Sequence, residues 1–319
     1  MKITRDFLNG KVIDVHTHCG GINFTHYFLE AFPYCCTIRE LILNMDNAKV
    51  DFSVTFPIPT NICTDISPMV DKLTREIIMN NEPCLYYLAN RRLLIETNMY
   101  GRGRVLPFVI FSLYGDFERQ IENINALIKE YDIYGVKIHT SADHTSLNRI
   151  LENPTLFSFF QDLDLPIIIH SGFEEYSDAI EMCTVFEKLS KIRFCVAHAG
   201  RMKSQFLNKI DILDNVWIDI SPLSHLSETL IGRSDDVVRL DYSNPLNMVN
   251  YLIERFPNKV LFGTDYPWVN CGYLEKYKNS QMGDDYQRCI DLLNVLPTDS
   301  IKKIANKNIC DFLFGEVHG

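Results

Sequence analysis

The stretch Val12-Ile13-Asp14-Val15-His16-Thr17-His18 decides the fold, because an apolar, strand-like run ends there in two histidines one residue apart. Side chains of a strand alternate between its faces, so His16 and His18 are expected to point the same way. Two imidazoles on one face can bind a single metal ion. Asp14, one step deeper on that face, could orient a histidine as a neighbouring carboxylate. For an isolated His-x-His motif, two loop histidines are an equally good interpretation.

Four further segments repeat this pattern of an apolar run that ends in His or Asp. They are Gly135-Val136-Lys137-Ile138-His139, Pro166-Ile167-Ile168-Ile169-His170, Arg193-Phe194-Cys195-Val196-Ala197-His198 and Val260-Leu261-Phe262-Gly263-Thr264-Asp265. Taken singly, each residue has a plainer interpretation, such as a core histidine bonded to backbone or a turn aspartate. In a parallel barrel, however, the carboxyl ends of all strands meet at the active site. Five such ends together predict a metal centre.

Eight strand candidates alternate with helical patterns along the chain. The strand candidates lie near 12–18, 51–56, 105–111, 134–139, 166–170, 193–198, 216–220 and 259–264. Apolar residues at helical spacing fall within 117–131, 178–189, 286–296 and 301–314. This alternation predicts an α/β fold, a parallel (β/α)8 barrel. No Pro/Gly/Ser-rich linker or short repeat interrupts it, which favours one domain over residues 1–319.

Two intervals, 57–104 and 221–258, are long for barrel connections and are expected to be loop insertions that cap the site and set substrate choice. The first contains Cys84-Leu85-Tyr86-Tyr87-Leu88, an apolar and aromatic helix candidate. That helix would either cover the barrel or make a dimer contact, so a homo-oligomer stays open.

Composition narrows the class of partner. Among 319 residues, 46% are hydrophobic and the formal net charge is -10, with scattered Lys and Arg, which argues against nucleic acid or an anionic membrane surface. The longest apolar runs have only the length of a strand, so we expect no membrane span. The ten cysteines include no C-x-x-C pair, and the first residues lack the apolar core of a signal peptide. We therefore expect reduced thiols, a cytoplasmic location and a small-molecule substrate.

In their order, the five segments resemble successive blocks of the amidohydrolase superfamily. The resemblance is strongest to its amidohydrolase-related branch, which includes the aminocarboxymuconate semialdehyde decarboxylase group. The closing segment Ile304-Ala305-Asn306-Lys307-Asn308-Ile309 is similar to the C-terminal helix of that branch. The resemblance spans nearly the whole chain and implies a metal-dependent enzyme with a distorted (β/α)8 TIM barrel. It also implies a divalent metal ion, often zinc, inside the barrel mouth.

The resemblance further implies roles for individual residues. It implies that the metal ligands are His16, His18, His170 and Asp265. Asp265 would also move a proton, so Asp265 and His198 are the expected catalytic residues. In members with one ion, the residue that His198 matches polarises or protonates the substrate; in members with two ions it binds the second.

Lys137 and His139 are ambiguous under this resemblance. In binuclear members a lysine at the position of Lys137 is carbamylated and bridges two ions, whereas an unmodified ammonium would instead bind a substrate carboxylate. His139, two residues further on, is expected to face the same side and line the pocket. We favour one divalent ion, zinc, with a binuclear site and carbamylated Lys137 as the alternative.

The expected reaction is hydrolysis of an amide, lactone or related bond of a small molecule. A zinc-type ion lowers the pKa of bound water to about 7, Asp265 would accept the proton, and His198 would hold the carbonyl oxygen. The alternative is a decarboxylase, a lyase acting on an unsaturated or aromatic carboxylic acid, with Arg39, Arg201 or Lys137 binding carboxylate. A third hypothesis, a barrel that only binds a ligand, is disfavoured because the site retains groups for proton transfer.

Overall fold

The computed structural model describes residues 2–20, 37–58, 86–233, 236–267 and 283–315. Within them, eight parallel strands form one sheet in chain order, so each strand pairs with the next. The strands are β1 (Ile13–His18), β2 (Phe52–Phe56), β3 (Val105–Ile110), β4 (Gly135–Ile138), β5 (Ile167–Ile169), β6 (Phe194–Val196), β7 (Val216–Asp219) and β8 (Val260–Leu261). The predicted strands are thus confirmed, although β8 is much shorter than 259–264.

The barrel closes where the chain after β8 meets β1. The amide of Val15 donates to the carbonyl of Phe262 over 3.0 Å, and the amide of Asp265 donates to the carbonyl of His16 over 2.8 Å. Gly263 permits this close approach, because a Cβ atom there would lie only 2.8 Å from Cβ of His16. The result is the predicted distorted (β/α)8 barrel, nearly closed and with its last strand reduced to a short ladder.

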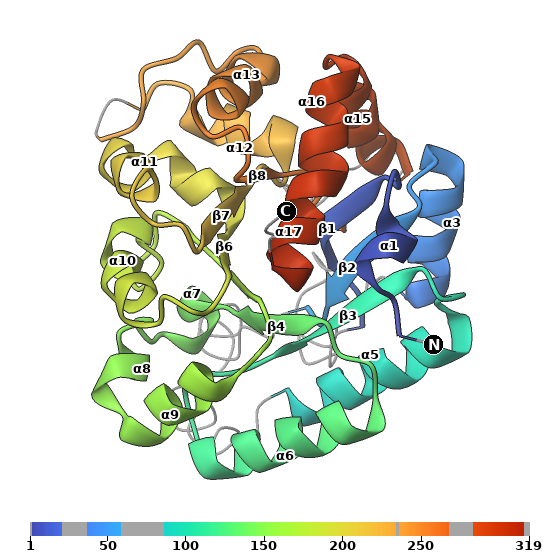
Figure 1. Cartoon of the computed structure of the whole chain (residues 1–319). Helices are drawn as coiled ribbons and strands as arrows, with labels where there is room; N and C mark the ends of the chain where they lie inside the picture. The colour runs from blue at the N-terminus through green and yellow to red at the C-terminus, as the bar shows by residue number, and fades with distance from the viewer. Residues whose placement is uncertain (1, 21–36, 59–85, 234–235, 268–282, 316–319) are drawn as a thin grey trace, which may run out of the picture.

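Helices surround the sheet and form an outer layer (Figure 1). From the amino terminus to β5 they are α1 (Arg5–Leu8), α3 (Ile38–Ala48), α5 (Tyr87–Tyr100), α6 (Phe117–Glu130), α7 (Thr140–Asp143), α8 (Arg149–Glu152) and α9 (Pro154–Asp162). After β5 they are α10 (Ala179–Lys188), α11 (Ser204–Ile210), α12 (Leu223–Leu230), α13 (Pro245–Arg255), α15 (Gly283–Asn294), α16 (Thr298–Lys302) and α17 (Asn308–Phe314), with a π-helical turn at Lys303–Lys307 between the last two. All four predicted helical regions are confirmed. None of the helices in the described ranges is both long and apolar enough to cross a membrane.

Side chains that cap helix amino termini explain where several of these helices begin. Thr37 and Glu40 form a reciprocal capping box at the start of α3. Asp116 accepts a hydrogen bond from the Arg119 amide at the start of α6. Asn153 likewise accepts from the Leu156 amide at the start of α9, where Pro154 is the first helical residue. These local signals, together with the apolar face of each helix, fix the alternation of strand and helix.

The amino-terminal end of the barrel is filled by α17. Arg193, just before β6, donates from Nε to the carbonyl of Phe312 over 2.7 Å. The Phe312 ring lies 5.9 Å from that of Trp217 on β7, so the two side chains pack against each other. With this end covered by the protein itself, the carboxyl ends of the strands are left to form a site.

The two long intervals are only partly described. Residues 59–85 lie outside the described residues, and so do Cys84 and Leu85 of the predicted helix, whereas Tyr87 and Leu88 begin α5. The interval 221–258 contributes α12 and α13. Whether either interval caps the site stays a prediction.

Candidate metal centre

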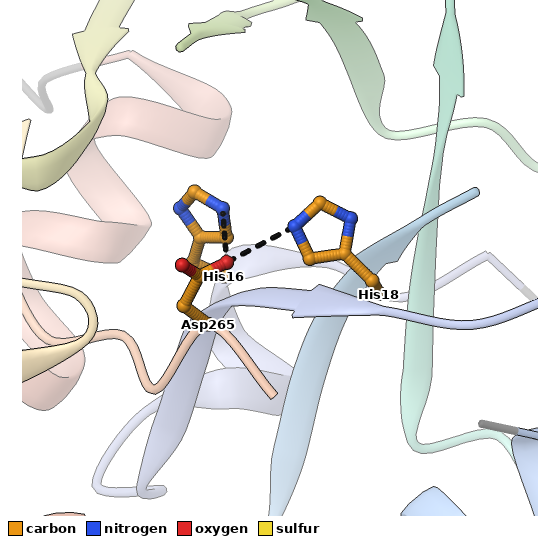
Figure 2. Close-up of side chains that lie close together, drawn as sticks. All are labelled: His16, His18 and Asp265. Carbon is orange, nitrogen blue, oxygen red and sulfur yellow. Dashed lines mark hydrogen bonds and ion pairs between the residues drawn. The ribbon is translucent and has the colours of Figure 1, made fainter. Parts of the chain in front are cut away.

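Three of the predicted ligands meet at the carboxyl end of the barrel. His16 and His18 both approach the same oxygen of Asp265, with Nε2–Oδ1 distances of 3.2 and 3.0 Å (Figure 2). One ligand atom from each of the three residues lies within 4.8 Å of the other two, and all three residues are buried. The prediction that His16 and His18 share a face is confirmed.

The outer nitrogens of the two imidazoles show which atoms carry protons. Nδ1 of His16 lies 2.9 Å from a carboxylate oxygen of Asp219, and Nδ1 of His18 lies 3.4 Å from the carbonyl of Pro57. Both partners only accept hydrogen bonds, so each Nδ1 donates. Nε2 of each ring faces the Asp265 carboxylate, and a cation that took the place of this contact would meet the Nε2 lone pair of a neutral ring. Nε2 of both rings and a carboxylate oxygen therefore converge on one point, and two imidazoles with a carboxylate are a donor set that a zinc-type cation takes.

The charges of these groups follow from the same contacts. Burial alone would raise the pKa of Asp265, but the neighbouring His16 and His18 hold it well below the usual range. Burial and Lys137 push the pKa of His16 down, whereas Asp219 and Asp265 outweigh them and raise it. Burial lowers the pKa of His18 to about 4. One carboxylate thus stays ionised beside two imidazoles, a favourable environment for a cation.

Asp219 and Ser221 also belong to this site, and Asp219 was not among the site residues expected from the sequence. The second oxygen of Asp219 accepts from the His198 amide (3.1 Å) and from the Ser221 amide (3.0 Å) and hydroxyl (2.5 Å). Burial opposes ionisation, but His16 and these hydrogen bonds hold the pKa of Asp219 well below its ordinary value. The signal was present in the sequence, since Val216-Trp217-Ile218-Asp219 is another apolar run that ends in a carboxylate.

Asp14 does not lie where strict alternation puts it. Asp14 pairs with Ser53 and Thr17 pairs with Thr55, so three steps along β1 match two along β2. Because of this bulge, Asp14 lies on the same face of β1 as Thr17. The prediction that Asp14 shares a face with His16 is therefore wrong. Asp14 instead accepts hydrogen bonds from the His16 amide (3.1 Å) and from the amide and hydroxyl of Thr264 (3.0 and 2.7 Å). It therefore fixes backbone between β1 and the end of β8.

The other predicted histidines form a second group beside the first. Nε2 of His198 lies 3.1 Å from Nδ1 of His170, and the rings of His170 and His139 stack with centroids 3.9 Å apart. Nδ1 of His198 donates to the Ser221 carbonyl over 2.6 Å, so Nε2 of a neutral His198 accepts a hydrogen bond from Nδ1 of His170. This leaves the lone pair of His170 on its own Nε2.

All three rings of this second group are neutral. Burial and, for each ring, neighbouring cations or imidazoles lower the pKa of His198 to about 3 and those of His139 and His170 well below the usual value. His170 is not part of the three-residue cluster found among the described residues, so its role as a ligand stays a prediction. His139 faces the site as expected, and its Nδ1 also accepts from the Ala142 amide at the start of α7.

Lys137 ends inside the barrel with an ammonium group that has no hydrogen-bond partner among the described residues. Its Nζ lies 4.7 Å from the centre of the Phe56 ring, and the same ring contacts His16 and His18. Burial lowers the pKa of Lys137 to about 8, against the opposing effect of Asp219 and Asp265. Lys137 thus lies beside the site, but its modification and its ligand stay predictions.

A left-handed turn follows β6 and carries His198. His198, Ala199, Gly200 and Arg201 have φ of 50–58° and ψ of 28–34°, the mirror image of a 3-10 turn. Such angles are unfavourable for residues other than glycine, and they persist where surrounding contacts enforce them. Gly200 is required, because a Cβ atom there would lie 2.2 Å from the Phe206 ring. Backbone strain is thus concentrated at the mouth of the barrel.

A (β/α)8 barrel with histidines and an aspartate converging at its strand ends is the architecture of an enzyme whose site could hold a metal ion. A sequence model of the family described as Amidohydrolase matches residues 79–309. The chain therefore belongs to the amidohydrolase family. The matched stretch includes His139, His170, His198 and Asp265 and begins after the histidines of β1. A search of the curated proteins found no match.

Solved structures show the same fold at low sequence identity. A 5-carboxyvanillate decarboxylase from Novosphingobium aromaticivorans, complexed with manganese and a nitrobenzoic acid, is 12% identical with a TM-score of 0.62, over 98% of this chain and 99% of that one. A probable 2-pyrone-4,6-dicarboxylic acid hydrolase from Acinetobacter baumannii with bound citric acid is 15% identical with a TM-score of 0.59, over 96% and 100%. An amidohydrolase from Burkholderia multivorans with bound zinc is 12% identical with a TM-score of 0.56, over 96% and 99%. These similarities establish the fold but not the substrate.

Proposed function

We propose that the chain is a metal-dependent hydrolase that cleaves an amide, lactone or related bond of a small molecule. The observation that carries this proposal is the convergence of Nε2 of His16, Nε2 of His18 and Oδ1 of Asp265, one ligand atom from each of three buried residues within 4.8 Å of one another. Family membership, and the zinc and manganese in two structures with a similar fold, support a metal-dependent enzyme.

The residues present fit one divalent ion, and zinc is the ion we propose. His16, His18 and Asp265 would hold it, with His170 as the fourth protein ligand through its free Nε2 lone pair. A bound ion of this kind supplies Lewis acidity, which makes water more acidic and a carbonyl more electrophilic. Asp219 fixes the tautomer and orientation of His16 through the 2.9 Å contact with Nδ1.

Asp265 and His198 are the proposed proton-transfer groups. Asp265 stays ionised, so its free oxygen accepts a proton from attacking water and passes it to the leaving group. His198 is neutral with Nε2 as the acceptor, so it donates to a substrate oxygen only after it takes up a proton there. Negative charge that develops on the substrate beside Nε2 favours this protonation.

Decarboxylation is the second candidate, and Lys137 is the observation that favours it. Its buried ammonium has no hydrogen-bond partner among the described residues and faces the candidate metal centre, where it would pair with a carboxylate of the substrate. A proton taken up from water at Nε2 of His198 would then pass to the carbon that loses CO2. Product analysis separates the candidates, because decarboxylation releases CO2 and hydrolysis yields a new acid with an amine or alcohol.

Metal analysis of purified protein tests the site itself. We expect about one divalent ion per chain in the wild type, as a single zinc-type site holds one ion. We expect loss of that ion in His16→Ala and His170→Ala. His144→Ala is the matched control, because His144 is exposed and contacts only Tyr176 among the described rings. Full occupancy in both site variants refutes the ligand assignment; two ions with a carbamylated Lys137 would establish the binuclear alternative.

We also propose a cytoplasmic location and a single domain over 1–319. The cysteines in the described residues are buried and are not in disulfides, as expected of a chain kept under reducing conditions. A homo-oligomer stays a prediction. Fractionation of cells and the sedimentation of purified protein would test these points.

A further inference from the structure

Ser221 lies between the two groups of histidines at the barrel mouth. It is fully buried and comes two residues after the end of β7. Its carbonyl accepts a hydrogen bond from Nδ1 of His198 over 2.6 Å, and its hydroxyl oxygen lies 3.1 Å from Nδ1 of His16. One residue thus contacts an imidazole of the candidate metal centre and an imidazole of the second, neutral group.

The hydroxyl group of Ser221 uses its whole capacity for hydrogen bonds inside the site. A serine hydroxyl has one proton to donate and two lone pairs to accept with. It donates to Oδ1 of Asp219 over 2.5 Å. Its lone pairs then face Nδ1 of His16 at 3.1 Å and, in a weaker contact, Nδ1 of His198 at 3.5 Å. Both of these nitrogens carry a proton, so the direction of all three contacts is fixed.

The same hydroxyl completes the set of donors around Asp219. Oδ2 of this carboxylate accepts from Nδ1 of His16 over 2.9 Å. Oδ1 accepts from the amides of His198 and Ser221 and from the hydroxyl. Because Asp219 is fully buried, these donors replace the water that an ionised carboxylate would otherwise bind. Without the hydroxyl, Oδ1 keeps only two amides, and the carboxylate is held less firmly against His16.

The packing around Ser221 allows the hydroxyl to be removed by itself. A Cβ atom at Gly263 would lie 2.8 Å from Cβ of His16 and 3.3 Å from Cβ of Ser221, so the closing seam of the barrel packs against both residues. Ser221→Ala removes one oxygen atom and keeps the Cβ atom in this packing. The backbone carbonyl that accepts from His198 is also kept.

We propose that Ser221 is a positioning residue of the metal centre, whose hydroxyl acts through Asp219 on His16. The hydroxyl holds the carboxylate in the place where its other oxygen orients His16, with Nε2 toward the metal site. Through its carbonyl, the same residue keeps the proton of His198 on Nδ1 and so joins the two groups of histidines. The inference rests on the proposed function, since it needs an ion at His16.

Zinc affinity of the purified protein, measured by competition with a chelator, tests this role. Ser221→Ala should bind zinc about tenfold more weakly than the wild type, the lower end of the loss that follows removal of a group behind a metal ligand. Ser227→Ala is the matched control. Ser227 lies on α12, is equally buried, and its hydroxyl donates to the Tyr242 carbonyl over 2.6 Å. This variant also loses a buried hydrogen bond but should keep the wild-type affinity.

A double-variant cycle separates positioning through Asp219 from a merely structural role. If the hydroxyl acts through the carboxylate, its removal matters little once the carboxylate has been replaced. Ser221→Ala should therefore lower the affinity by less than about threefold in a chain that already carries Asp219→Asn. A structural effect that is independent of Asp219 would lower the affinity by about tenfold in either background.

The outcomes distinguish this inference from the proposed function. Melting temperatures are measured on every variant, so a loss of the fold is recognised. The inference is overturned, and the proposed function is left intact, if Ser221→Ala keeps the wild-type affinity or if its loss is the same in both backgrounds. An equal loss of affinity in Ser227→Ala also overturns it. A wild type that binds no zinc contradicts the proposed function, and the inference falls with it.

Discussion

The two sides of the barrel mouth contain the same residue type in opposite surroundings. On one side, His16 and His18 face Asp265, and Asp219 supports His16 from behind. On the other, the rings of His139, His170 and His198 contact one another, and within the described residues none makes a hydrogen bond to a carboxylate. Carboxylates therefore decide which imidazoles are suited to hold a cation. The second side stays neutral and is joined to the first by Ser221.

The largest expected effect is that of Asp265→Asn on turnover. The amide fills the same space but is a poor proton acceptor, so turnover should fall about 100-fold or more, within the usual contribution of a general acid or base. Metal content must be measured on the same sample, since Asp265 is also a proposed ligand. A variant with its ion and near-normal turnover on a verified substrate would show that the proton shuttle is another group.

His198→Asn probes the neutral side of the mouth. Turnover should fall by about 100-fold, because no group then takes a proton beside the substrate oxygen, while metal content stays at the wild-type level. Steady-state kinetics and metal analysis of one preparation check both parts. If the variant loses its ion together with its activity, His198 is itself a metal ligand, and the division of the mouth into a metal-binding side and a neutral side is wrong.

Asp219→Asn probes the support behind His16. Only one Asn oxygen remains to accept hydrogen bonds from His16, His198 and Ser221, so the affinity for metal should fall about 10- to 100-fold. Competition with a chelator measures that affinity. Asp132→Asn is the control, because Asp132 is exposed before β4. If Asp219→Asn and the wild type bind metal with equal affinity, Asp219 does not support the metal site.

The last expected effect concerns stability rather than activity, at Asp143, a buried carboxylate with no basic partner among the described residues. It accepts from the Ser112 hydroxyl (2.9 Å) and the Leu113 amide (2.7 Å), and burial raises its pKa to about 7. Since the folded chain holds a proton that the unfolded chain releases above its ordinary pKa of 3.8, this contribution to stability is complete below that pH and is lost as the pH rises through 7.

Asp143→Asn should remove this dependence, because the amide can accept from Leu113 and donate to Ser112 without ionising. Unfolding of both proteins by denaturant between pH 4 and 8 measures their free energies of unfolding. The difference between the two free energies should grow with pH in favour of the variant, by about 4 kcal/mol at most. A difference that does not change with pH would show that Asp143 is ionised throughout.

Much of the fold follows from local sequence signals. Apolar runs of strand length and helical apolar spacing locate the strands and helices, because each element buries one face against its neighbours. The short ladder of β8 does not follow, since it depends on Gly263 lying against His16 across the closing seam. The bulge in β1 is likewise a tertiary feature, and without it Asp14 would share a face with His16.

The candidate site divides in the same way. His16, His18, His170, His198 and Asp265 stand at strand ends, where the pattern of a parallel barrel makes them visible. The left-handed turn was not predictable, because Ala-His-Ala-Gly-Arg offers only one glycine to suggest it. Its contacts come from elsewhere in the chain: Asp219 accepts from the His198 amide, and the Ser171 carbonyl accepts from Arg201. The position of Arg201 depends on that turn.

A crystal structure with anomalous scattering at the zinc edge, from protein grown with zinc, tests the central claim most directly. The account predicts one strong peak about 2.0–2.2 Å from Nε2 of His16, Nε2 of His18 and an oxygen of Asp265. His170 should complete the ligand set and Lys137 should be unmodified. A peak bound by His139, His170 and His198 alone, or protein that holds no ion in this mouth, would contradict the division between the two sides.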